Sequence, residues 1–78
     1  MSYTNALLDN NGFYYSHDCG CTPKGHVFKH KIHKHIEVTI YPSVNNFEIK
    51  KYNKYSYGKK PLINLEQTLN SFNYSESK

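Results

Sequence analysis

The segment HVFKHKIHKHIEVTIY, residues 26–41, carries the sustained two-residue periodicity of this chain. Five apolar side chains fall on even positions, and the odd positions between them hold Lys, His, Glu and Thr. The even set is Phe28, Ile32, Ile36, Val38 and Ile40. Such alternation is typical of a β-strand with one buried and one solvated face. The segment therefore predicts one long strand, or two pieces that break near His33 and Lys34 and bend around the core.

Length and composition favour a single small domain spanning residues 1–78. A chain of 78 residues supports one small core, and the mean hydropathy of −0.80 is low, but eight Tyr and four Phe supply large buried areas. The sequence has no apolar run of membrane-spanning length and no basic and then apolar N-terminal pattern. We therefore expect a cytoplasmic protein that does not enter a membrane.

The basic residues are all lysines, and the net charge is +4. This balance favours a polyanionic partner, either nucleic acid or an acidic protein or nucleoprotein surface. Lysine suits phosphates but lacks the planar fork with which arginine reads guanine, so little sequence preference is expected. The alternative is genome composition, because Lys, Asn and Tyr have A/T-rich codons and account for 27 of the 78 residues. Small size and this bias suit a bacteriophage or another mobile element.

The chain before residue 26 predicts a helical segment, a strand and a loop. Residues 1–12 contain Ala-Leu-Leu and end in Asp-Asn-Asn-Gly, which stops helices. Residues 13–17 are aromatic and predict a strand. Residues 18–25 contain two Gly and one Pro and predict a loop.

A further alternating strand spans residues 47–52. Two registers with residues 26–41 keep the apolar residues of both strands on one face, as a half-buried sheet requires. A two-residue turn pairs Ile40 with Lys51, whereas a six-residue loop pairs Ile40 with Phe47. The sequence leaves both open, with some irregularity expected at the intervening proline.

The C-terminal part predicts one helix in residues 61–73, with Asn64 at the cap position. Its apolar stripe consists of Leu65, Leu69 and Phe72. Residues 74–78 are polar and expected to fray. The expected fold is α+β: a meander-like antiparallel sheet of three to four strands in residues 13–60, the C-terminal helix on one face, and residues 1–12 at one end.

A candidate metal site surrounds the Cys-Gly-Cys sequence. Two thiols and two imidazoles can close a tetrahedral zinc site, although structural sites usually place two residues between paired cysteines. The candidate ligands are His17, Cys19, Cys21 and His26. The alternative is two free thiols with solvated histidines and no cofactor. A disulfide between the two cysteines would be strained and is not expected in the cytosol.

Three further histidines lie in the long alternating segment. Strand geometry places His33 and His35 on the wet face and His30 on the other. They do not converge on one ion unless the strand bends, so we expect surface residues whose charge changes with pH.

Lysines and tyrosines interleave in residues 50–60, as a single-stranded nucleic-acid surface requires, with cations along phosphates and aromatic faces for bases. The alternative is that the tyrosines are core or cross-strand residues with an ordinary preference for strands, and that the lysines are a solvated edge of the sheet. The candidate nucleic-acid-binding residues are Lys29, Lys31, Lys34, Lys50, Lys51, Lys54, Lys59, Lys60, Tyr52, Tyr55 and Tyr57.

Enzyme motifs are missing from the sequence: it has no close carboxylate pair, phosphate-cradling glycine loop or nucleophile elbow. The leading hypothesis is a non-catalytic nucleic-acid-binding module. The first alternative is a small phage or mobile-element protein that binds and inhibits a host protein or nucleoprotein complex. A zinc-stabilised structural component is the third, and an exposed edge strand would also permit a homodimer.

Overall fold

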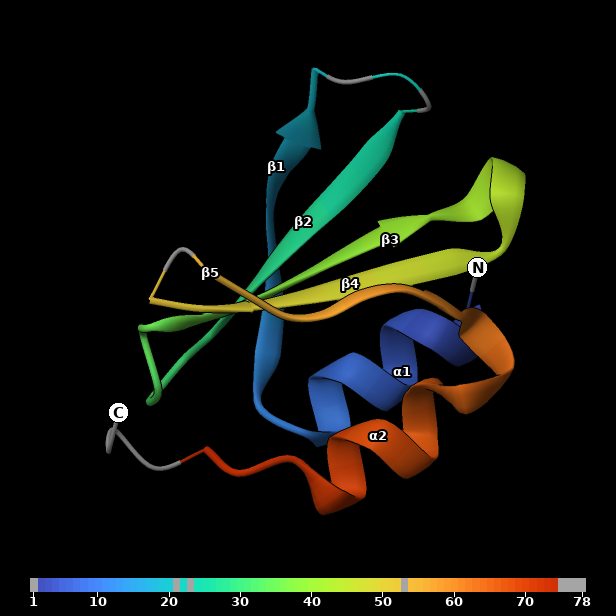
Figure 1. Cartoon of the computed structure of the whole chain (residues 1–78). Helices are drawn as coiled ribbons and strands as arrows, with labels where there is room; N and C mark the ends of the chain where they lie inside the picture. The colour runs from blue at the N-terminus through green and yellow to red at the C-terminus, as the bar shows by residue number, and fades with distance from the viewer. Residues whose placement is uncertain (1, 21, 23, 53, 75–78) are drawn as a thin grey trace.

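The computed structural model describes residues 2–20, 22, 24–52 and 54–74. They form two α-helices, five β-strands and two short 3-10 turns (Figure 1). In chain order these are α1 (Ser2–Asn10), β1 (Phe13–Cys19), β2 (Gly25–His30), β3 (Ile36–Tyr41), η1 (Pro42–Val44), β4 (Asn46–Lys51), β5 (Lys54–Pro61), η2 (Leu62–Asn64) and α2 (Leu65–Ser71).

The strands form one antiparallel meander in the order β1-β2-β3-β4-β5, with β1 and β5 at the edges. The α+β class and the meander are confirmed, and the strand count of three to four is wrong, because the described residues form five strands. The long alternating segment is two strands joined by a turn at residues 31–35, which is the alternative with a break near His33 and Lys34. The chain reverses again after β4, and this adds the edge strand β5.

The β2–β3 hairpin turns at residues 31–35. His30 ends β2 with only 7% of its surface exposed, and its Nδ1 atom accepts hydrogen bonds from the backbone N–H groups of Ile32 (3.1 Å) and His33 (3.0 Å). Ile32, expected in the buried set, is 77% exposed on this turn. A buried imidazole thus satisfies turn amides that would otherwise need solvent or turn-forming residues.

The β3–β4 register is the longer-loop alternative, with Ile40 opposite Phe47 and Val38 opposite Ile49. Pro42 starts the η1 turn, where its missing N–H costs no ladder hydrogen bond, and Asn45 closes the turn with a φ of 55°. The irregularity expected at the proline is therefore this 3-10 turn. It keeps the apolar residues of β3 and β4 on one face.

A tight reversal at Tyr52, with a φ of 57°, separates β4 from β5. Residues 54–61 form an edge strand, although they contain Gly58 and Pro61. Both residues fit an edge, because β5 pairs on one side and shows register shifts against β4.

The core lies between one face of the sheet and the two described helices, which lie side by side beneath it (Figure 1). Its fully buried side chains include Leu8 of α1, Phe13 of β1, and Leu65 and Leu69 of α2. Of the predicted apolar stripe, Leu65 and Leu69 are buried on α2, whereas Phe72 follows the end of the helix in an extended conformation and is partly buried against the core. Asn64 occupies the cap position without a side-chain cap hydrogen bond.

Within the described part of the chain, no helix has the length and apolar character needed to cross a membrane.

Candidate functional site

Two turns far apart in sequence meet at one end of the sheet. The backbone N–H of Tyr52, in the β4–β5 turn, donates to the carbonyl oxygen of His35, in the β2–β3 turn, at 2.9 Å. The two rings stack, with centroids 4.8 Å apart and planes at 25°. Tyr52 keeps 38% of its surface exposed. An aromatic side chain is therefore displayed where the two turns join.

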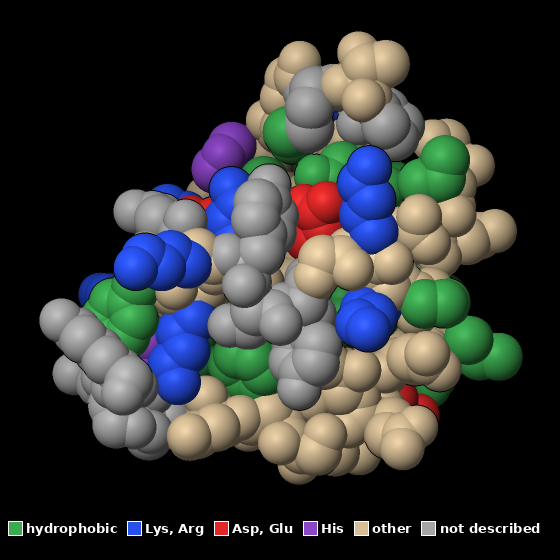
Figure 2. Space-filling view, viewed as in Figure 1, with side chains coloured by type: hydrophobic (Ala, Val, Ile, Leu, Met, Phe, Trp, Pro, Cys, Tyr) green, Lys and Arg blue, Asp and Glu red, His purple; other side chains and the backbone are tan. Residues whose placement is uncertain are grey.

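Four of the candidate lysines lie on or beside these turns, and we call this group the basic end: Lys31, Lys34, Lys51 and Lys54. Lysine side chains are visible there, on the left of the molecule in Figure 2. The Lys31 Nζ atom is 3.9 Å from Asp9, a weak surface pair. Lys51 donates to the carbonyl oxygen of Asn73 at 3.1 Å. Among the described residues, Asp9 is the one carboxylate that pairs with a lysine of the basic end, so this end keeps net positive charge.

The remaining candidate lysines lie elsewhere. Lys29 is on the outer face of the sheet, away from the helices, with its Nζ atom 3.8 Å from Glu37. Lys50 pairs in register with the same glutamate. Lys59 and Lys60 are exposed at the far end of β5. The eight lysines therefore do not form one surface, and acidic side chains lie between lysines on the face in Figure 2.

The candidate tyrosines separate in the same way. Tyr52 is at the basic end, whereas Tyr55 and Tyr57 lie on β5, where Tyr55 pairs with Lys50 and Tyr57 with Ile49. The side chains of these two tyrosines lie outside the part of the structure that is described. Their predicted stacking role stays a prediction.

The four predicted zinc ligands are not brought together among the described residues. His17 pairs with Val27 and Asp18 with His26, so the two histidines are on opposite faces of the β1–β2 hairpin. Cys19 is disulfide-bonded, contrary to the expectation of free thiols, and Cys21 lies outside the described residues. No cluster of three metal-ligating side chains occurs among the residues described. Structural zinc stays a prediction.

The three other histidines do converge, because the strand is interrupted between them. The His30 and His33 ring centroids are 4.8 Å apart, and those of His33 and His35 are 6.0 Å apart. Tyr74 stacks on His33 at 5.4 Å and donates its hydroxyl to the carbonyl oxygen of Leu69 at 3.0 Å, so this part of the predicted frayed tail is packed.

His30 is a core residue rather than a surface one. Its Nε2 atom lies 2.9 Å from the carbonyl oxygen of Asn11, and its Nδ1 accepts the two turn amides, which together require the neutral ring with a proton on Nε2. Burial lowers the pKa of His30, and the neighbouring His33 and His35 rings lower it further. The hydrogen bond to Asn11 raises this pKa, but its effect is smaller than that of burial.

Asp18 was not predicted as a site residue. Its Oδ1 atom is 2.6 Å from the Tyr15 hydroxyl and 2.7 Å from Nδ1 of His26. The hydrogen bonds from Tyr15 and His26 lower the pKa of Asp18, so the carboxylate stays ionised. The sequence contains these three residues but gives no sign that a bulge in β1 brings them together at one cavity.

No protein-family model matches the sequence, and the comparisons with curated proteins and with solved structures find no significant match.

Proposed function

We propose that this protein is a non-catalytic module that binds single-stranded nucleic acid at its basic end. The supporting observation is the Tyr52–His35 contact, which joins two lysine-bearing turns around an exposed aromatic ring. The charges and the ring come from segments about twenty residues apart, and they meet only because β3 and β4 pair over their whole length.

The chemistry of these groups suits a flexible polyanion. Lysine ammonium groups contact phosphates as point charges, and an exposed tyrosine stacks a base for about 1–3 kcal/mol. A single strand can place a phosphate and an unstacked base on such a small site, whereas a duplex keeps its bases stacked. Because few phosphates are contacted and no arginine is present, weak and largely sequence-independent binding follows.

Fluorescence anisotropy of labelled oligothymidine, oligouridine and duplex DNA, titrated with protein at several salt concentrations, tests the proposal. We expect single strands to bind more tightly than the duplex, with log K falling linearly with log salt at a slope of about −0.7 per phosphate contacted. Tyr52→Ala should weaken binding by about tenfold through lost stacking without changing the salt slope.

Paired charge variants locate the site. The double variant Lys34→Gln and Lys54→Gln removes two charges from the basic end. The double variant Lys59→Gln and Lys60→Gln removes two charges from the far end of β5. Lys54 and Lys60 are nearly 20 Å apart along this strand, at about 3.3 Å per residue. The first pair should reduce both affinity and salt slope, and the second should have a smaller effect. Equal losses would contradict the location, and no binding at low salt would contradict the function.

A second candidate is protein binding at the free edge of β1, the mode expected of a small inhibitor of a host complex. It is favoured by two exposed aromatics on that edge strand, Tyr14 at 45% and Tyr15 at 53% exposure. Such a strand can add to a partner's sheet, with the aromatics supplying contact area. Binding of one protein at defined stoichiometry that survives moderate salt, with no oligonucleotide binding, would favour this candidate.

A further inference from the structure

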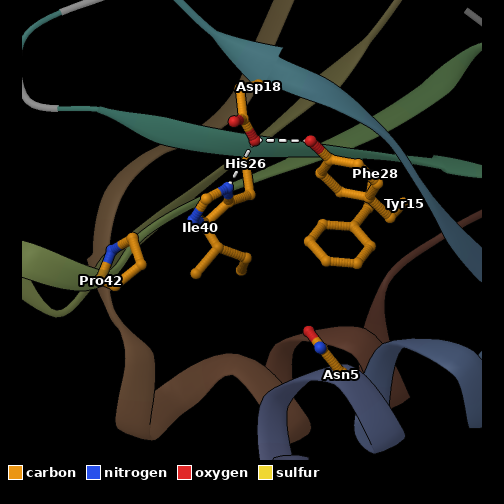
Figure 3. A pocket seen from close by; sticks show the side chains of 7 residues that line it. All are labelled: Asn5, Tyr15, Asp18, His26, Phe28, Ile40 and Pro42. Atoms are coloured by element: carbon orange, nitrogen blue, oxygen red, sulfur yellow. Dashed lines mark hydrogen bonds and ion pairs between the residues drawn. The ribbon is translucent and has the colours of Figure 1, made fainter. Parts of the chain in front are cut away.

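We propose that the cavity between the sheet and α1 is a binding site for a small neutral aromatic molecule that carries a hydroxyl group. The cavity has a volume of about 580 Å³, within the range of small-molecule sites. It is lined by Asn5, Tyr15, Asp18, His26, Phe28, Ile40 and Pro42 (Figure 3). This site is at the opposite end of the sheet from the basic end, because it uses the end of β1 and the start of β2.

The polar wall of the cavity determines that Nδ1 of His26 carries a proton. The Asp18 Oδ1 atom accepts the Tyr15 hydroxyl at 2.6 Å and faces His26 Nδ1 at 2.7 Å. An ionised carboxylate can only accept, so Nδ1 of His26 must carry the proton. In the neutral tautomer that this contact selects, the Nε2 atom is unprotonated and accepts a hydrogen bond. The Tyr15 hydroxyl already donates its proton to Asp18. A ligand that contacts Nε2 of His26 therefore has to supply the hydrogen-bond donor.

The other walls select an apolar, flat body. Phe28 and Ile40 form the sheet side, and the His26 ring hangs into the cavity above Ile40 (Figure 3). Pro42 bounds one side, and Asn5 reaches into the cavity from α1, opposite Asp18. Aromatic and aliphatic walls with a few placed polar groups, here the His26 imidazole and the Asn5 amide, are usual for a site that takes a mostly apolar ligand. An aromatic ring with one hydroxyl meets these requirements, since its hydroxyl can donate to Nε2.

The probes are 4-methylphenol and 4-methylanisole, which share a ring but differ in whether the oxygen carries a hydrogen. Titrations followed by ¹H–¹⁵N spectra should show saturating shifts around Asp18, His26 and Ile40 with 4-methylphenol, at a millimolar dissociation constant suited to a fragment of this size. 4-Methylanisole should bind at least about fivefold more weakly, the worth of one hydrogen bond. Equal affinities, or no shifts at the cavity, would overturn the proposal.

Two histidine variants form a matched pair. His26→Phe keeps an aromatic ring but removes the acceptor, so the preference for 4-methylphenol over 4-methylanisole should disappear. His17→Phe makes the same change on the opposite face of the hairpin and should keep the preference. Loss of the preference in both variants, or in neither, would count against the role of His26.

N-acetyltyrosinamide separates a free ligand from a tyrosine side chain of another protein. The proposal requires it to bind more weakly than 4-methylphenol, because its backbone groups have no polar partners in the apolar part of the cavity. Tighter binding would overturn the assignment to a free small molecule. Oligonucleotide binding at the basic end is measured separately, so failure of either site is distinguishable from failure of the other.

Discussion

The Nε2 atom of His30 lies 2.9 Å from the carbonyl oxygen of Asn11, which ties the last residue of β2 to the connection between α1 and β1. The other ring nitrogen accepts two amides of the next turn. One neutral imidazole therefore holds a hairpin turn and a helix connection at the same time. A proton on Nδ1 would place a donor against two donors, which is the physical basis of the first prediction.

Stability should fall when the pH drops below about 6.5, the ordinary pKa of histidine. The folded-state pKa of His30 is lowered by burial, so the unfolded chain takes up a proton before the folded chain does. The contribution of His30 is complete above the unfolded pKa and is lost as the pH falls towards the folded pKa. Urea midpoints measured at neutral pH and in mild acid will report this loss.

The matched variants are His30→Gln and His17→Gln. The first should lower stability at neutral pH and flatten the pH dependence below about 6.5, because the titrating group is gone. The second changes an exposed histidine and should leave the pH dependence as in the unchanged protein. A pH dependence that persists in His30→Gln would contradict its assignment to His30.

Gly12→Ala should destabilise the fold by about 1–3 kcal/mol. Gly12 has a φ of 89°, and a Cβ atom there would lie 2.7 Å from Nε2 of His30. The substitution therefore strains the backbone and also displaces the ring that binds Asn11. Gly20→Ala is the control, because a Cβ at Gly20 meets no atom within 4 Å. Equal urea midpoints for the two variants would contradict the close approach of His30 to the α1–β1 connection.

Leu8→Ala should cost about 2–5 kcal/mol, enough to unfold much of a domain of this size. Leu8 is fully buried and anchors α1 on the core. Ile32→Ala removes a comparable volume but should change stability by less than about 0.5 kcal/mol, because Ile32 is 77% exposed. Thermal unfolding followed by circular dichroism separates the two. A large effect at Ile32 would instead favour the single long strand, one of the two alternatives that the alternation allows.

A metal chelator should leave the unfolding midpoint unchanged, since His17 and His26 face opposite sides of the β1–β2 hairpin. The measurement is a thermal scan with and without chelator under reducing conditions, together with zinc analysis of the purified protein. One zinc per chain and unfolding upon chelation would instead support the four-ligand hypothesis and require the hairpin to rearrange.

The buried faces of the strands and of the C-terminal helix follow from the residue pattern alone. Alternation in residues 36–41 and 47–51 assigns Ile36, Val38, Ile40, Phe47 and Ile49 to one side, and all five are buried. This succeeds because side-chain direction in a strand has a strict period of two, so local pattern is enough. The spacing of Leu65 and Leu69 predicts the buried face of the helix for the same reason, because side-chain direction in a helix also has a fixed period.

Tertiary structure decided where the chain reverses. Residues 31–35 contain no Gly, Pro or Asn, so the sequence leaves a single long strand and a break near His33 and Lys34 as open alternatives. The turn forms because a buried histidine supplies the acceptors for its amides, and that histidine is itself held by Asn11, nineteen residues away in the sequence. Local pattern carries no information about a hydrogen bond of this range.

The same limit applies to the two candidate sites. The lysines and Tyr52 were identified from composition, but their division into a basic end and separate outlying positions depends on strand pairing. The contact of Asp18 with His26 depends on the β1 bulge, which sets which residues of β1 face the helices. Charge and residue type are properties of the sequence, whereas proximity across strands is a property of register, and only the folded chain fixes register.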